Sequence, residues 1–442
     1  MDKPVIEIKR FYGAGPKGQN SRRNCMEKLK NKMILAEGAY YDLNDRVTQL
    51  NNNVCIAGAS GSGKTRSIVE PNLLQAIGSY IITDPKGNLI NRHAAYLKRK
   101  GYAVRKLNFS DPGDQTSCGY NFFHYIHSEQ DCLKIAHMII YASDTAEKRA
   151  DPFWDAAAEL FLVAVISYLY LHAAEKERTI QNMLSLIQGC EPDEYEETYQ
   201  SATDVLFENI GRNNPDDFSY RCYSRFRQAA CKTLKSIIIT LNAHLAVFDT
   251  KECRRLLQKD TVRLEDIGEH KTALFVVVSD TDRSMDMMAN LFLTQAIHEL
   301  CRMADSHENS RLPIDVRFIL DDFATNVRIA DFPRMISSIR SRGISAMITI
   351  QSESQLSSAY GEDGRTILGT CDTCVYLGGN DIETAQHVAR RVDQPITNIL
   401  NMPVGTCWIF RRGQQPVNAR IIQLDRFLEK LQIKPMENDN KA

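Results

Sequence analysis

The segment with the clearest chemistry is Gly58–Thr65, which reads GASGSGKT and fits the pattern GxxxxGK[ST]. Glycines in such a loop let backbone N–H groups wrap phosphate groups, and a helix that begins at the loop adds a favourable dipole. Lys64 would reach the β- and γ-phosphates of a nucleotide, and the hydroxyl of Thr65 would ligate Mg²⁺. The predicted phosphate-binding residues are Gly58, Ala59, Ser60, Gly61, Ser62, Gly63, Lys64 and Thr65.

A loop of this kind works with a carboxylate at the end of a neighbouring strand. The apolar run VRFIL (316–320) ends in Asp321 and Asp322. Asp321 would hold the Mg²⁺ shell through water, and Asp322 could polarise the attacking water. Two acids in a turn after a strand are the plainer interpretation, but the phosphate-binding loop favours the metal site.

Two further side chains are candidates, each with an alternative that the residues leave open. Gln351 follows the apolar run at 346–350 and could sense a γ-phosphate, although a satisfied polar residue at a strand end explains it equally well. Arg340 lies between the acids and Gln351. In ring-forming NTPases an arginine from the next subunit stabilises transition-state charge. From the residues alone, an ordinary solvated arginine is the simpler interpretation.

The elements that must position these side chains follow from the hydrophobic pattern. Apolar runs that alternate with helical segments predict a mostly parallel α/β sheet. Residues 128–257 instead have a helical period almost throughout, with a loop at 213–217, so an all-helical insertion interrupts the α/β domain. The predicted strands are 53–59, 79–84, 104–109, 273–279, 316–322, 346–351, 373–378 and 406–412.

Composition limits the class of protein. The chain has 442 residues, enough for two structural units, and a formal net charge of −1, so contact with nucleic acid must be local. Its 12 cysteines have no repeating spacing, and the first residues carry no signal peptide, which indicates a reducing cytosol. The most apolar run, 161–171, is shorter than the ~20 residues of a membrane span and predicts a buried core helix.

Several segments, in order, carry a resemblance to a known family. They are GASGSGKTRSIVEPNLL, SYIITDPKGNL, Asp151-Pro-Phe-Trp154 followed by a helix and Arg178-Thr179, RFILDDFA, IRSRGI, ITIQSESQLSSAYG and VYLGGNDIETA. From about residue 34 to residue 430 the chain resembles the TraG/TraD-like coupling proteins of type IV secretion systems. These are P-loop ATPases of conjugative DNA transfer.

The resemblance implies a RecA-like nucleotide-binding domain interrupted by an all-α domain, working as a Mg²⁺-dependent ATPase with ATP and Mg²⁺ as cofactors. It places Arg340 at the family's trans-acting arginine and Gln351 at its glutamine motif, and it adds Arg66 to the nucleotide-binding residues. The catalytic predictions are therefore Asp322, Gln351 and Arg340, and the metal predictions are Thr65 and Asp321. The expected parts are a basic arm (1–33), the nucleotide-binding domain (34–127 and 258–433), the all-α domain (128–257) and a polar tail (434–442).

The partners implied by the resemblance belong to conjugation. A homo-hexameric ring would pass single- or double-stranded DNA through its pore. The all-α domain would receive a relaxase and relaxosome accessory proteins, and secretion-channel proteins would meet the ring at the inner face of the membrane. Relatives commonly carry two transmembrane helices before the nucleotide-binding domain. This chain shows none, so we expect a cytoplasmic protein docked at the membrane through partners.

One departure from the family pattern bears on activity. The usual acid pair is Asp-Glu, whereas this chain has Asp321-Asp322, and aspartate is one methylene shorter. We expect the attacking water to be less well held and hydrolysis to be slow. Two other functions stay open: an FtsK/HerA-like translocase on duplex DNA, and a non-hydrolysing ATP-bound adaptor.

Overall fold

The computed structural model describes residues 29, 31–141, 152–193, 199–325 and 327–431. Most of the predicted basic arm and all of the polar tail lie outside the described residues, as does Asp151 of the DPFW motif.

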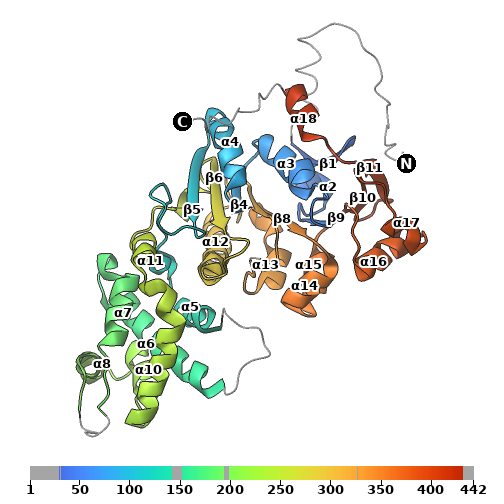
Figure 1. The fold of residues 1–442 in the computed structure, drawn as a ribbon. Helices are drawn as coiled ribbons and strands as arrows, with labels where there is room; N and C mark the ends of the chain where they lie inside the picture. The colour runs from blue at the N-terminus through green and yellow to red at the C-terminus, as the bar shows by residue number, and fades with distance from the viewer. Residues whose placement is uncertain (1–28, 30, 142–151, 194–198, 326, 432–442) are drawn as a thin grey trace, which may run out of the picture.

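A nine-stranded sheet forms the centre of the nucleotide-binding part, in the order β11-β10-β9-β3-β8-β7-β4-β6-β5 (Figure 1). The strands from β9 to β5 are parallel, and β10 is antiparallel to both β9 and β11. The strands are β3 (Val54–Ala57), β4 (Ser79–Pro85), β5 (Ala103–Asn108), β6 (Thr272–Val278), β7 (Val316–Leu320), β8 (Ile344–Ile350), β9 (Thr373–Tyr376), β10 (Thr406–Arg411) and β11 (Val417–Arg420).

The eight predicted strands are therefore present within a few residues of their predicted ends, and the prediction of a mostly parallel sheet is confirmed. Strands buried on both faces read as continuous apolar runs, which is why the pattern found them. Edge strand β11 was not predicted because it is short and mostly exposed. The hairpin of β1 (Lys32–Ala36) and β2 (Ala39–Asp42) was not predicted either.

Helices cover both faces of the sheet (Figure 1). On one face, the π-helix η1 (Thr65–Val69), α3 (Glu70–Leu74) and α4 (Asn88–Arg99) bury apolar side chains against the central strands. The short helix α2 (Asp45–Thr48) follows β2. The remaining helices of this part are α12 (Asp286–Ser306), α13 (Phe332–Ser338), η6 (Arg340–Arg342), α14 (Glu353–Tyr360), α15 (Asp363–Thr370), α16 (Ile382–Val392), α17 (Ile396–Leu400) and α18 (Leu424–Leu431).

Every described element between β5 and β6 is helical, and together they lie apart from the sheet at the lower left of Figure 1. They are η2 (Phe122–Tyr125), α5 (Glu129–Tyr141), α6 (Pro152–His172), η3 (Glu175–Glu177), α7 (Ile180–Gln188), α8 (Ala202–Asn213), α9 (Phe218–Phe226), α10 (Cys231–Leu245), η4 (Ala246–Asp249), α11 (Lys251–Leu256) and η5 (Leu264–Asp266). We call residues 122–256 the helical segment.

Helix α6 is the centre of the helical segment and packs against α5, α9 and α10. It has 21 residues, so it is longer than the apolar run predicted, and among the described residues it is the one helix long and apolar enough to cross a membrane. More than half of its most apolar stretch is nevertheless buried inside the protein, which agrees with a core helix.

The helical segment joins the rest of the molecule at a narrow neck, where the incoming and outgoing chains meet. Thr261 N donates to Gly119 O at 2.9 Å, and Tyr120 N donates to Leu256 O at 2.8 Å. A Cβ at Gly119 would lie 2.4 Å from Lys259 O, so only glycine fits there.

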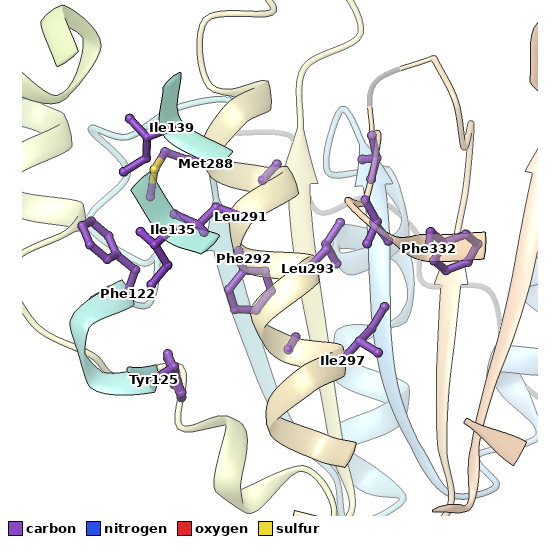
Figure 2. Close-up of a cluster of buried hydrophobic side chains, with 14 of the residues drawn as sticks. Phe122, Tyr125, Ile135, Ile139, Met288, Leu291, Phe292, Leu293, Ile297 and Phe332 are labelled. Atoms are coloured by element: carbon purple, nitrogen blue, oxygen red, sulfur yellow. The ribbon is translucent and has the colours of Figure 1, made fainter. Parts of the chain in front are cut away.

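An apolar cluster beside the neck ties the helical segment to the sheet (Figure 2). Phe292 of α12 packs edge-on against Tyr120, with ring centroids 5.0 Å apart. Further side chains of α12 meet Phe122 of η2 and Ile135 of α5 in the same buried cluster. The two parts therefore share one hydrophobic core at this junction.

Candidate functional site

The predicted phosphate-binding loop begins where β3 ends, at the carboxyl edge of the sheet. Gly58 N donates to Ile350 O at 3.1 Å, and Ala59 N donates to Gly378 O at 2.9 Å, so the ends of β8 and β9 hold the loop on both sides. Gly61 and Gly63 have φ of 76° and 92°. Residues other than glycine rarely adopt this conformation, which explains two of the three glycines of the motif.

Inside the loop, Lys64 is 7% exposed. Its Nζ donates to the carbonyl oxygens of Gly58 and Ala59, at 2.6 and 3.1 Å. Burial lowers the pKa of Lys64, while the charges of Asp322 and Asp321 oppose that shift. Ser62 Oγ is buried without a hydrogen-bond partner among the described residues, so the loop holds an unsatisfied polar atom that a bound phosphate group would satisfy.

A chain of hydrogen bonds joins the loop to the acids predicted to hold metal. Thr65 Oγ1 donates to Asp321 Oδ2 at 2.7 Å, and Thr349 Oγ1 donates to Asp321 Oδ1 at 2.7 Å. Asp321 is buried, and burial raises the pKa of its carboxyl group. The described residues hold no group of three or more His, Cys, Asp or Glu side chains placed so that they could hold a metal ion on their own. A hydroxyl and a carboxylate oxygen are nonetheless the hard ligands that Mg²⁺ accepts when phosphates and water complete its shell.

Asp322 lies beside this chain in an uncommon backbone conformation. Its φ is 51°, in the left-handed region, and its N–H donates to Thr349 Oγ1 at 2.9 Å. Aspartate tolerates this region better than most residues, and such strain gathers at functional sites. The charge of Asp322 acts on the pKa of Lys64, so the second acid lies near the loop.

Two residues at this edge were not predicted as part of the site. Thr349 supports both acids from inside β8; its signal was a polar residue within an apolar strand. Lys86, in the DPKG segment after β4, has φ of 73°, and its Nζ pairs with Asp280 Oδ2 at 2.7 Å. The hydrogen bond that Lys86 donates to Asp280, and to a smaller extent the charge of Asp322, raises the pKa of Lys86.

Replacing Thr349 by valine keeps the volume but removes the hydroxyl. We expect a loss of about 1–3 kcal/mol in unfolding free energy, because Asp321 Oδ1 and Asp322 N both lose a partner. Turnover of nucleotide should fall about tenfold or more as Asp321 shifts from its position. Urea unfolding and steady-state hydrolysis measure the two effects. Thr349→Ser restores the hydroxyl and should restore both values, and a valine variant with wild-type turnover would contradict the role.

The other predicted residues differ in where the structure places them. Gln351 is exposed at the end of β8, between β3 and β7, and its N–H donates to Gln355 Oε1 at 3.0 Å. Arg66 Nη2 contacts both carboxylate oxygens of Asp425 in α18, at 3.1 and 3.2 Å. Gln351 thus lies at the edge that carries the loop, while the guanidinium of Arg66 is paired with α18.

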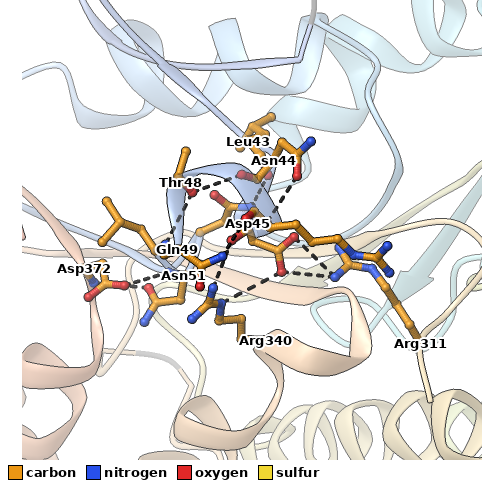
Figure 3. Close-up of polar contacts among 12 residues, drawn as sticks. Leu43, Asn44, Asp45, Thr48, Gln49, Asn51, Arg311, Arg340 and Asp372 are labelled. Atoms are coloured by element: carbon orange, nitrogen blue, oxygen red, sulfur yellow. Dashed lines mark hydrogen bonds and ion pairs between the residues drawn. The ribbon is translucent and has the colours of Figure 1, made fainter. Parts of the chain in front are cut away.

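Arg340 lies at the amino ends of the parallel strands, whereas the loop lies at their carboxyl ends. It precedes β8, a seven-residue strand parallel to β3, so about 20 Å separates it from its own phosphate-binding loop. Its Nη2 donates to Asp45 O at 2.9 Å (Figure 3). Within one chain the structure therefore does not bring Arg340 to the other predicted site residues.

Comparison with known proteins gives the chain its relatives. The family model described as "Type IV secretory system Conjugative DNA transfer" matches residues 17–394. Protein VirD4 of Rhizobium rhizogenes is 22% identical over 77% of this chain and 49% of its own length. Conjugal transfer protein TraG of Escherichia coli is 23% identical over 80% of this chain and 57% of its own length. The chain thus spans about half the length of the curated relatives it matches.

Solved structures share the fold. The bacterial conjugative coupling protein TrwBdeltaN70 has a TM-score of 0.65 at 16% identity, covering 95% of this chain and 96% of that one. TrwB in complex with the non-hydrolysable ATP analogue ADPNP has a TM-score of 0.63 with the same coverage. TrwB in complex with ADP and Mg²⁺ has a TM-score of 0.61, covering 94% and 97%. The predicted RecA-like P-loop fold is confirmed.

Proposed function

Because the chain belongs to the family of type IV secretory system conjugative DNA transfer proteins, we propose that it is an ATP-dependent coupling protein. It recruits a relaxase–DNA substrate and drives that substrate into a type IV secretion channel. The observation that carries the proposal is the hydrogen-bond chain from Thr65 through Asp321 to Thr349, which links the phosphate-binding loop to the acids of β7.

The residues at the carboxyl edge of the sheet, where the phosphate-binding loop lies, each have a role in this proposal. The backbone of Gly58–Thr65 and the Lys64 ammonium bind the β- and γ-phosphates. Thr65 and Asp321 hold Mg²⁺, and Asp322 orients and deprotonates the attacking water with help from Gln351. Bound ATP supplies the phosphoanhydride bond, and Mg²⁺ neutralises the charge on its phosphates. ATP and Mg²⁺ are supported by the TrwB structures that contain ADPNP or ADP with Mg²⁺.

The proposed assembly is a homo-hexameric ring with DNA in its pore. Arg340 is on the wrong edge of the sheet to act on its own nucleotide, which supports a role on the nucleotide of a neighbouring subunit. A ring of six puts one such arginine next to each site. The rate of hydrolysis should then depend steeply on protein concentration.

We assign cargo recognition to the helical segment. Exposed apolar side chains there include Leu160 of α6, Val205 of α8 and Ile239 of α10, the last 69% exposed. The segment lies apart from the sheet that carries the loop (Figure 1), which supports a role in contacting a relaxase or a relaxosome accessory protein. The chain would work in the cytoplasm at the inner face of the membrane, next to secretion-channel proteins.

The full chain allows a direct test. We expect Mg²⁺-dependent ATP hydrolysis that DNA stimulates, together with retention of the relaxase of the same conjugative element on the immobilised protein. Hydrolysis without any binding of relaxosome proteins, and stimulated only by duplex DNA, would instead support an FtsK/HerA-like translocase. If the chain shows no hydrolysis and binds no relaxosome protein, the proposal is overturned.

One observation favours the adaptor as a second candidate, namely the short side chain of Asp322 at a strained backbone position. If the chain is an ATPase, Asp322→Asn should lower turnover by about 10²-fold, because the amide cannot accept the proton of the attacking water. Nucleotide binding should persist. Asp322→Glu, which supplies one more methylene, is the matched variant and should keep or raise turnover. A wild-type rate at background, unchanged in the asparagine variant, would favour the adaptor.

A further inference from the structure

Within the part of the chain that the structure describes, Asp45 is the residue that holds Arg340. Its Nη2 donates to the main-chain oxygen of Asp45 at 2.9 Å, and its Nε lies 3.9 Å from Asp45 Oδ2. Its side chain is 37% exposed, so one face of the guanidinium is fixed and the other faces solvent. A long arginine side chain loses rotamer freedom when it is ordered, so an arginine that must reach a distant group benefits from being held beforehand.

Asp45 itself is nearly buried, at 8% exposure, and its carboxylate also forms an ion pair with a second arginine. Arg311 Nη1 donates to Asp45 Oδ2 at 3.0 Å and to Oδ1 at 3.3 Å. Two guanidinium groups thus approach the same carboxylate oxygen from different segments (Figure 3). Without that carboxylate the two cations would face each other across a few ångströms with only repulsion between them.

The helix that carries Asp45 is anchored on both sides. At its start, Asn44 Oδ1 accepts from Arg46 N, and Asp42 Oδ1 accepts from Asn44 N. After its end, Asp372 Oδ2 accepts from Asn51 N at 2.6 Å. A helix of four residues has little stability of its own, so these contacts and the Asp45–Arg311 pair fix the position of the Asp45 carbonyl.

We propose that Asp45 is the positioning residue for Arg340: it fixes the guanidinium at the edge of the subunit in the direction from which it reaches the nucleotide of the next subunit. This inference rests on the proposed ring ATPase. Asp45 touches neither substrate nor metal, and it acts only through Arg340. The role requires both its carboxylate, which separates the two arginines, and its main-chain oxygen, which orients one of them.

The first test measures steady-state hydrolysis by the full chain at a saturating protein concentration. Asp45→Ala should lower kcat between about tenfold and about 100-fold while KM for ATP stays nearly unchanged, because the nucleotide is bound at the opposite edge. Asp45→Asn keeps an oxygen acceptor without the charge, so its kcat should lie between the values of wild type and Asp45→Ala. Asp315→Asn is the control, since Asp315 also pairs with Arg311 but does not contact Arg340.

The second test separates positioning from a general loss of structure. A mixture of Asp45→Ala and Lys64→Ala chains should recover hydrolysis, because the Lys64→Ala subunit supplies a correctly held Arg340 to the intact site of its neighbour. A mixture of Asp45→Ala and Arg340→Ala chains should not recover. An Asp45→Ala chain that does not fold would recover in neither mixture, and Asp45→Asn then carries the test.

Failure of this inference and failure of the proposed function give different results. If Arg340→Ala hydrolyses ATP at the wild-type rate, the proposed role of Arg340 is wrong. If Arg340→Ala is inactive while both Asp45 variants keep wild-type kcat, or if the Asp45 variants are faster than wild type, the positioning role of Asp45 is overturned. An equal loss in Asp315→Asn would overturn it as well, because Arg311 alone would then explain the effect.

Discussion

Lys64→Ala is expected to abolish Mg²⁺-dependent ATP hydrolysis by the full chain, with a loss of at least about 10²-fold to 10³-fold in kcat. The ammonium of Lys64 is the one buried lysine charge in the loop, and alanine removes the side-chain charge that would meet the β- and γ-phosphates. The loop is otherwise held by backbone hydrogen bonds to Ile350 and Gly378, so the fold should persist.

Release of phosphate at saturating ATP measures this effect, and urea unfolding checks the fold. The two hydrogen bonds of Lys64 are partly offset by the cost of its burial, so stability should change by no more than about 2 kcal/mol. Lys98→Ala removes an exposed lysine of α4 and is the matched control, with no loss expected. Normal turnover in Lys64→Ala would refute the assignment of the loop.

Arg340→Ala should cost as much as Lys64→Ala, although the two residues lie at opposite edges of one subunit. An arginine supplied to a neighbouring site in phosphoryl transfer contributes about 10³-fold or more. Each variant alone should be inactive, but mixing Arg340→Ala with Lys64→Ala chains should restore part of the activity. In the mixture, some intact loops meet an intact arginine.

Hydrolysis rates over a series of mixing ratios provide the measurement, with a maximum expected at intermediate ratios. Arg342→Ala is the matched control, because Arg342 lies in the same short helix but pairs with Asp305 of its own chain through two bonds of 2.8 Å. Hydrolysis at the wild-type rate by Arg340→Ala, or an equal loss in Arg342→Ala, would show that Arg340 does not act in trans.

The sequence predicted the parts of the site whose chemistry is local. A glycine-rich loop after one apolar strand and two acids after another apolar strand can be recognised from residue type and position alone. The structure brings Thr65 and Asp321 to hydrogen-bond distance although 256 positions separate them. Parallel pairing of β3 with β8 and of β8 with β7 produces this meeting, and the rule that parallel strands end at one edge made it predictable.

The contacts that depend on three-dimensional register could not be predicted. Thr349 supports both acids because its strand, β8, lies beside β7; a threonine within an apolar strand is a signal, but it does not say which residues the hydroxyl contacts. Asp45 is 295 positions from Arg340, in a short helix of ordinary polar composition that follows the β1–β2 hairpin. Helix α6 extends beyond the apolar run 161–171, because its first turns carry Asp155 and Glu159 and fall outside that run.

The neck at Gly119 has a consequence for how proteins of this shape can diversify. The helical segment leaves and re-enters at points that are hydrogen-bonded to each other, through Gly119 with Thr261 and Tyr120 with Leu256. Chain insertions are tolerated best where their two ends already lie together. A different bundle of helices could therefore replace residues 122–256 during evolution without moving the loop, the acids or the sheet. Under the proposed function, substrate recognition and ATP hydrolysis can then change independently. The same nucleotide-binding part can serve a new transfer substrate after the exchange of a single segment.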